Sequence, residues 1–301
     1  MLGNATPALL LSHMTENKAS SPPPLRLGVV SYLNTLPLIE GLGASGDLEL
    51  IPAPPAQLIG MLASGEADAA LASVIDAAKA DPAVTLMRSG MIGCDGPTLT
   101  VRVFSRVPMD RIETLHADVE SHTSVALARV VLAKRFGAAP TIEAFDARSR
   151  SAEDPWPEAV LLIGDKVVTG APPEGAYAHE LDLGEAWKAL TGGPFVYAVW
   201  MCRSADLEDA ERAGRLRALA LMLDRARRHN QTRLDWTVAA HAPAHGWTNE
   251  QASEYVGARL RYEVTDAARD AIDEFWRACA ELGVIPAPAP SPVWMDQGAA
   301  G

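Results

Sequence analysis

The stretch LRLGVVSYLNTLPL at residues 25–38 constrains the fold more than any other part of the chain. Its residues 25–30 form a short apolar run, which is typical of a buried strand. The polar segment SYLNT follows at once, and Pro37 stands where the first turn of a helix could begin. A buried strand that leads directly into a helix predicts an open α/β fold, whose ligands bind at the carboxyl ends of the strands.

The polar segment at residues 31–35 has two interpretations. In the first, it is a helix cap, in which one side chain satisfies free backbone N–H groups. In the second, it binds a ligand, because four polar side chains are more than a cap needs. We favour the second interpretation and predict that Asn34 is a catalytic residue, with Ser31 and Tyr32 as neighbouring binding residues.

Composition limits the kinds of partner. The net charge of −12 and the isoelectric point near 5.0 argue against nucleic acid and against an anionic membrane surface. The three cysteines are too few and too far apart for a disulfide framework or a metal site, which favours a reducing, cytoplasmic location. We expect a small-molecule substrate, no metal and no cofactor.

The two ends of the chain differ in composition from the rest. Residues 1–24 contain a short apolar run with no basic residue before it, so we predict a disordered leader and not a secretory signal. No apolar run approaches the length of a membrane span. Residues 286–301 are rich in proline, and we expect a tail that wraps the surface or is disordered.

A second strand end lies farther along the chain. The pattern predicts strands at 48–51 and 67–72 around a helix at 56–63, and Ser73 follows the later strand. We expect Ser73 to lie opposite Asn34, although a cap for a helix at 74–79 explains it equally well. This strand–helix–strand arrangement recurs in type II periplasmic-binding-protein folds, and many other α/β proteins share it.

The sequence SHTS at residues 121–124 opens a predicted helix at 125–136, which Gly137 ends. A helix start with hydroxyls and free N–H groups favours bound anions, because its dipole is positive there. A capping box is the alternative. Before this helix, we expect a short helical piece at 112–116 and a strand at 117–120. The candidate anion-binding residues are Ser121, Thr123 and Ser124.

These motifs together resemble a known family. SYLNTLPL at 31–38 is similar to the opening motif of the chorismate dehydratases of the futalosine route to menaquinone. The family pattern Ser-Arg-Thr-Ser-Val-Ala-Leu corresponds to SHTSVAL at 121–127, where His122 replaces the usual Arg. The segment at 182–200 also matches closely. The resemblance covers about residues 25–286.

The resemblance implies a two-lobed α/β fold of the type II periplasmic-binding-protein kind, with a cleft between the lobes and C-terminal helices. GPTLTVRVF at 96–104 is similar to the family's crossing strand, which places Thr98 at the cleft. The return strand at 194–202 brings Phe195 and Tyr197 there, unless their rings belong to the core. The expected parts are residues 25–102 and 200–285 for the first lobe and 103–199 for the second. Within 200–285, helices are expected at 207–230, 232–241, 249–260 and 265–282.

The implied activity is that of a carbon–oxygen hydro-lyase, which dehydrates chorismate to 3-[(1-carboxyvinyl)oxy]benzoate. Two alternatives remain open. A solute-binding or sensory protein of the same fold would use the same cleft without chemistry. The sister enzyme, dihydroxynaphthoate synthase, opens with a Ser-Pro-Cys-Pro-Asn-Asp type of motif, which this chain lacks.

Overall fold

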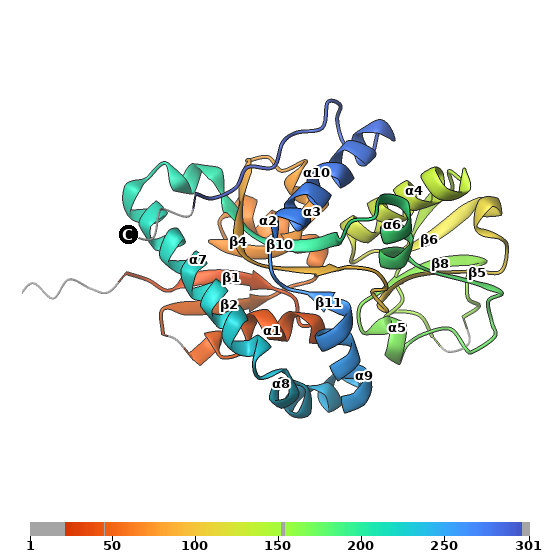
Figure 1. Ribbon diagram of the computed structural model, residues 1–301, viewed down its shortest axis with the longest axis horizontal. Helices are drawn as coiled ribbons and strands as arrows, with labels where there is room; N and C mark the ends of the chain where they lie inside the picture. The colour runs from red at the N-terminus through yellow and green to blue at the C-terminus, as the bar shows by residue number, and fades with distance from the viewer. Residues whose placement is uncertain (1–21, 45, 152–153, 297–301) are drawn as a thin grey trace, which may run out of the picture.

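The computed structural model describes residues 22–44, 46–151 and 154–296. These residues form two lobes side by side, and each lobe is built around one β-sheet (Figure 1). The predicted two-lobed α/β fold is therefore confirmed. The predicted leader falls almost entirely outside the described residues.

The first lobe contains a six-stranded mixed sheet. Its strands β2, β1 and β3 are parallel, and β10 and β4 continue the sheet in antiparallel fashion. The short β11 closes the other side. In spatial order, the strands are β11 (Leu260–Arg261), β4 (Val84–Cys94), β10 (Phe195–Arg203), β3 (Ala69–Ser73), β1 (Leu25–Val29) and β2 (Leu48–Pro52).

The second lobe contains a five-stranded sheet. Here β7, β6 and β8 are parallel, and β5 runs antiparallel to both of its neighbours. The residues predicted as a short helical piece at 112–116 instead enter β6, because Leu115 and Ala117 alternate with more exposed residues and bury on one face. In spatial order, the strands are β7 (Thr141–Phe145), β6 (Thr114–Asp118), β8 (Ala159–Ile163), β5 (Val101–Ser105) and β9 (His179–Asp182).

Helices cover both sheets. In Figure 1, α10 lies on one side of the first lobe, while α7, α8 and α9 lie on the other. None of the helices in the described ranges is long and apolar enough to cross a membrane. The helices are α1 (Leu36–Ile39), α2 (Leu58–Ser64), α3 (Val74–Ala77), α4 (His122–Phe136), α5 (Lys166–Thr169), α6 (Leu183–Thr191), α7 (Ala210–Gln231), α8 (Leu234–His241), α9 (Asn249–Ser253), the π-helix Glu254–Arg259, and α10 (Asp266–Glu281).

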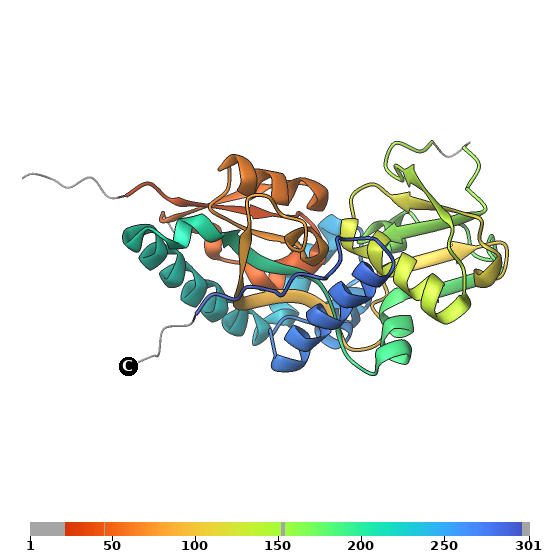
Figure 2. The same ribbon diagram turned by 90° about the horizontal axis from the view of Figure 1, so that it is seen from above.

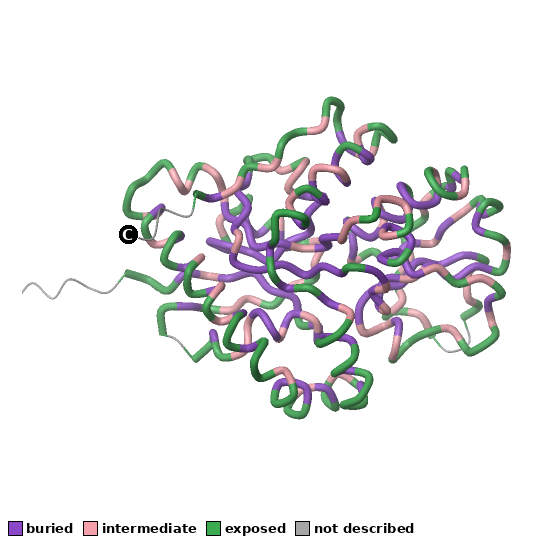
Figure 3. The backbone as a smooth tube through the Cα atoms, viewed as in Figure 1, coloured by how far each residue is buried: buried purple, intermediate pink, exposed green. Residues whose placement is uncertain are grey.

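Two chain segments connect the lobes. The chain leaves the first sheet after β4 and enters the second at β5, and it returns through α6 into β10. The lobe boundaries expected at 102/103 and 199/200 fall inside β5 and β10. Buried residues follow the strands through both lobes (Figure 3). Trp187 and Trp200 are among the largest side chains that are fully buried.

The proline-rich tail packs on the first lobe as far as the structure describes it. Backbone hydrogen bonds join Leu86 of β4 to Val293 (2.8 Å) and to Met295 (2.7 Å). Figure 2 shows this segment running back along the lobe from α10. Of the two alternatives for the tail, wrapping of the surface therefore holds for residues up to Asp296.

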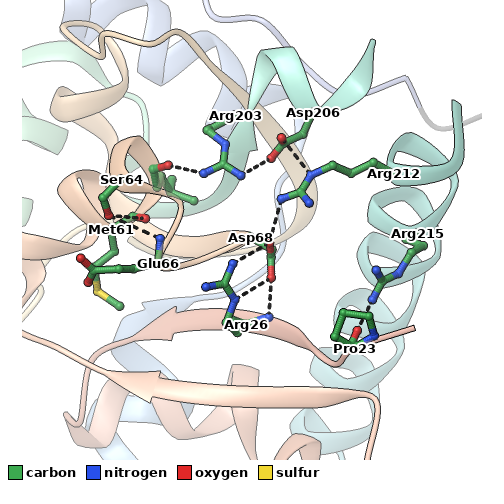
Figure 4. Close-up of polar contacts among 11 residues, drawn as sticks. Pro23, Arg26, Met61, Ser64, Glu66, Asp68, Arg203, Asp206, Arg212 and Arg215 are labelled. Atoms are coloured by element: carbon green, nitrogen blue, oxygen red, sulfur yellow. Dashed lines mark hydrogen bonds and ion pairs between the residues drawn. The ribbon is translucent and has the colours of Figure 1, made fainter. Parts of the chain in front are cut away.

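The amino ends of the parallel strands are held by ion pairs. Asp68 accepts hydrogen bonds from the Arg26 backbone (2.8 Å) and from the Arg212 guanidinium of α7 (2.8 Å). Asp206 joins Arg212 to Arg203 at the end of β10, with both contacts at 2.9 Å (Figure 4). Burial opposes ionisation of Asp68, but the hydrogen bonds from Arg26 outweigh it and lower the pKa of this carboxyl. This network fastens the sheet edge opposite the cleft.

Candidate functional site

A cavity of about 70 Å³ lies between the two lobes. Its polar wall combines the carboxyl ends of β1 and β3, the start of α4, the crossing segment before β5, and two tyrosines from the first lobe. Its apolar wall includes Leu71, Ile92 and Ile163. The polar lining residues are Tyr32, Asn34, Ser73, Thr98, Thr100, Ser121, Thr123, Ser124, Tyr197 and Tyr255.

Asn34 lies in the turn that follows β1. Its amide nitrogen donates to the hydroxyl of Tyr255 at 3.1 Å, and its amide oxygen accepts from the hydroxyl of Thr35 at 3.2 Å. The Asn34 side chain is half-buried and lines the cavity. It therefore presents to the cavity an amide that can both donate and accept.

The start of α4 faces Asn34 from the second lobe. Ser121 caps the helix by accepting from the Ser124 N–H at 3.1 Å, so a simple cap exists in place of the capping box given as the alternative. The hydroxyl of Thr123 accepts from the Ile75 N–H of the first lobe at 3.4 Å. Ser73 lines the same cavity at the end of β3. The structure thus brings the amide predicted after one strand, the hydroxyl predicted after another and the hydroxyls predicted at one helix start to a single cavity.

The crossing segment is fixed by one carboxylate. Asp182 accepts from the backbone N–H groups of Thr98 (2.9 Å) and Leu99 (2.7 Å), and it caps α6 through Gly184 (3.0 Å) and Glu185 (3.1 Å). Leu99 has a φ of +75°, which is unusual for a residue with a side chain. A Cβ atom at position 184 would come within 2.1 Å of the Thr98 hydroxyl, so only glycine permits this close approach.

Two buried tyrosines supply hydroxyls from the first lobe. Tyr197 and Thr98 hydrogen-bond through their hydroxyls at 2.7 Å, and Tyr255 and Thr100 do so at 2.6 Å. Burial raises the pKa of both Tyr197 and Tyr255 above the ordinary value. Both phenols therefore keep their protons at neutral pH and serve as neutral hydrogen-bonding groups.

Among the described residues, no Asp, Glu, Lys, Arg or His lines the cavity. Charged residues gather instead around an adjoining hollow that shares Tyr32 with the cavity, and there Tyr32 donates to Glu120 across the two lobes. Lys166 contacts Glu120 at 2.8 Å, and Arg148 contacts it at 3.3 Å. Burial opposes ionisation of Glu120, but the hydrogen bonds from Lys166 and Tyr32 outweigh it and lower the pKa of this carboxyl.

The structure places three residues of interest outside this cavity. Ser31 is exposed and lines a separate hollow with Glu120 and Arg148. Phe195, predicted to face the cleft, is instead a core residue, because its ring packs against Phe275 at 4.9 Å and other aromatic rings. His122 points away from the cavity and contacts both carboxylate oxygens of Asp76 at 2.9 Å.

Sequence reasoning missed Thr100 and Tyr255. Thr100 belongs to the crossing segment that was recognised, but only Thr98 was selected from it. Tyr255 lies within a predicted helix, and its partner Asn34 is 221 positions earlier in the chain. No local pattern marks a helical tyrosine as part of such a distant site.

Comparison with solved structures shows the fold. The aliphatic sulphonate binding protein SsuA of Escherichia coli matches with a TM-score of 0.61 and 14% identity, over 89% of this chain and 96% of that chain. The CA3427 gene product of Candida albicans, described as having the generic periplasmic binding protein fold, matches with a TM-score of 0.59 and 13% identity, over 93% and 100% of the two chains.

Comparison of sequences shows the family. The chorismate dehydratase of Thermus thermophilus is 30% identical over 224 residues, which span 65% of this chain and 80% of that protein. Residues 25–281 match the family model described as menaquinone biosynthesis. The chain therefore belongs to the menaquinone biosynthesis family, as a relative of chorismate dehydratase.

Proposed function

We propose that this protein dehydrates chorismate to 3-[(1-carboxyvinyl)oxy]benzoate in the cavity between its lobes. The observation that supports the proposal is that Asn34, in the SYLNTLPL motif, lines the same cavity as the hydroxyls at the start of α4. The 30% identity to a chorismate dehydratase supports the choice of substrate. The buried, free cysteines are consistent with a reducing compartment, which we take to be the cytoplasm.

The reaction removes water from the ring. A proton leaves the carbon that bears the enolpyruvyl ether, and the hydroxyl leaves the neighbouring carbon with its bonding electrons. Removal of the proton leaves negative charge on the ring, and this charge is conjugated with the ring carboxylate. Hydrogen-bond donors that hold this carboxylate stabilise the developing charge, and the start of α4 with Ser121, Thr123 and Ser124 is our candidate for that role.

The residues that line the cavity limit which group can accept the ring proton as the base. The described lining residues include no carboxylate, amine or imidazole, and the tyrosines are kept neutral by burial. We therefore assign the base to the enolpyruvyl carboxylate of the substrate itself, held near the ring proton by the closed lobes. Asn34 then orients the substrate through its amide, and a phenol can donate a hydrogen bond to the departing hydroxyl.

Incubation of the purified protein with chorismate tests the activity, because the product is an aromatic enolpyruvyl ether with its own ultraviolet absorbance. We expect Asn34→Ala to lower kcat by about 10²-fold, since its amide contact strengthens in the transition state. Asn249→Ala, an exposed asparagine outside the cavity, is the matched control and should retain wild-type turnover.

The outcomes separate this proposal from the solute-binding alternative. A protein that binds chorismate but forms no product would be a binding protein. A protein that neither binds nor converts chorismate would require another substrate. Near wild-type turnover by Asn34→Ala would show that Asn34 is only a turn residue.

A further inference from the structure

A residue outside the recognised motifs holds the Asn34 side chain in place. Tyr255 lies in the π-helix Glu254–Arg259, among the C-terminal helices of the first lobe. We propose that Tyr255 is a positioning residue, whose hydroxyl fixes the Asn34 amide in the orientation that the reaction needs. This inference rests on the proposed function for its kinetic consequences, but its structural content can be tested without chorismate.

The hydrogen bonds define the orientation of the amide. The Tyr255 hydroxyl accepts from the Asn34 Nδ2 at 3.1 Å, and it shares a second hydrogen bond with the Thr100 hydroxyl at 2.6 Å. The other end of the amide accepts from the Thr35 hydroxyl at 3.2 Å. One amide proton and one lone pair of the amide oxygen remain for a ligand. Tyr255 and Thr35 thus hold the Asn34 amide at both of its ends.

Tyr255 is itself held from both lobes. Its ring is fully buried and stacks on Trp247, with the ring centroids 5.0 Å apart and the planes at 6°. The Trp247 indole donates to Asp165 at 3.0 Å, and the other oxygen of Asp165 contacts His245 at 3.1 Å. Asp165 follows β8 of the second lobe. The phenol is therefore part of a rigid connection between the second lobe and Asn34.

The local backbone agrees with such a role. The chain after α9 continues as a π-helix, and π-helical turns occur frequently at functional sites. The turn brings Tyr255 and Leu260 into the lining of the cavity. Burial raises the pKa of Tyr255, so its hydroxyl keeps its proton at neutral pH and remains able to bond both Asn34 and Thr100.

Replacement of the hydroxyl alone is the appropriate perturbation. Tyr255→Phe keeps the ring and its stacking on Trp247, but it frees the Asn34 amide to rotate. We expect kcat to fall about 10- to 100-fold, with KM changed less than about threefold, because small losses of alignment act mainly on the chemical step.

Tyr262→Phe is the matched control. Tyr262 is equally buried, and its hydroxyl has no hydrogen-bond partner in the described part of the chain. Loss of this hydroxyl should leave kcat within about twofold of wild type, since it holds no side chain of the cavity. Comparable losses of kcat in the two variants would assign the effect of Tyr255→Phe to general disturbance of the core and would overturn the inference.

A double-mutant cycle separates positioning from a merely structural effect. If Tyr255 acts through Asn34, then Tyr255→Phe should lower kcat by less than about threefold in the Asn34→Ala background. Effects that multiply would overturn the inference.

A crystal structure of Tyr255→Phe provides the test without substrate: a rotated or doubly occupied Asn34 amide supports positioning, and an unchanged amide contradicts it. Absence of chorismate dehydration by the wild type would refute the proposed function alone.

Discussion

The carboxylate of Asp182 controls the path of the chain between the lobes. It accepts from the buried N–H of Thr98 and the half-buried N–H of Leu99, and it also caps α6. Leu99 keeps its left-handed φ of +75° under this restraint. We predict that Asp182→Ala destabilises the protein far more than loss of an ordinary helix cap does.

The size of the effect follows from the groups left without partners. A buried backbone N–H without a hydrogen bond costs about 1–3 kcal/mol, and Thr98 contributes one such group and Leu99 a partly exposed second one. Loss of the cap adds about 1 kcal/mol. The expected decrease in the free energy of unfolding is therefore about 3–5 kcal/mol, before any relaxation of Leu99.

Urea denaturation of Asp182→Ala and Asp209→Ala measures this difference. Asp209 caps α7 through the Arg212 N–H at 2.8 Å and holds no crossing segment, so its loss should cost only about 1 kcal/mol. If the two variants lose the same free energy within about 0.5 kcal/mol, the bonds to Thr98 and Leu99 contribute nothing to stability and the reasoning is refuted.

Two further predictions concern the base and His122. His122→Ala should keep most of the wild-type kcat. A chorismate analogue without the enolpyruvyl carboxylate should bind and not dehydrate. Turnover of that analogue would show that the protein supplies the base. The hydrogen bond to Asp76 raises the pKa of His122 above its ordinary 6.5. The contribution of protonated His122 to the stability of the folded protein is therefore complete below pH 6.5, and it is lost as the pH rises through the raised pKa. The difference in Tm between wild type and His122→Gln should therefore be larger at about pH 5.5 than at about pH 9, and a constant difference would contradict it.

The parts of the fold that follow local patterns were predictable. The apolar run before Ser31 becomes β1, and the SHTS sequence begins α4, because both features depend on residues close together in the chain. The helical piece expected at 112–116 was wrong because a five-residue strand shows too few alternations to be distinguished from a helical turn.

The site was predictable only where its side chains follow strand or helix ends. Successive residues of a helix are turned by about 100°, so Thr123 faces the cavity while His122 next to it faces Asp76. In β10, Phe195 and Tyr197 both point to one face, but their environments differ: the Tyr197 hydroxyl reaches Thr98, and the Phe195 ring stays among aromatic rings. Only tertiary packing distinguishes these neighbours.

The strongly negative charge of the chain initially argues against a dianionic substrate, and the arrangement of the site removes this objection. At physiological ionic strength, charges more than about 8 Å apart across solvent are largely screened, so the net charge of −12 acts weakly on a ligand inside the closed lobes. Acidic residues around the cavity already have partners, since Asp182 accepts from backbone N–H groups and Glu120 contacts Lys166 and Arg148. The described lining offers neutral hydroxyls, an amide and a helix start, and such dipoles interact more strongly with an anion where water is excluded. Because the described lining contains no charged side chain, the enolpyruvyl carboxylate of the proposed substrate, chorismate, has no ion-pair partner there. That carboxylate is then available to take the ring proton, which makes substrate-assisted proton removal chemically reasonable.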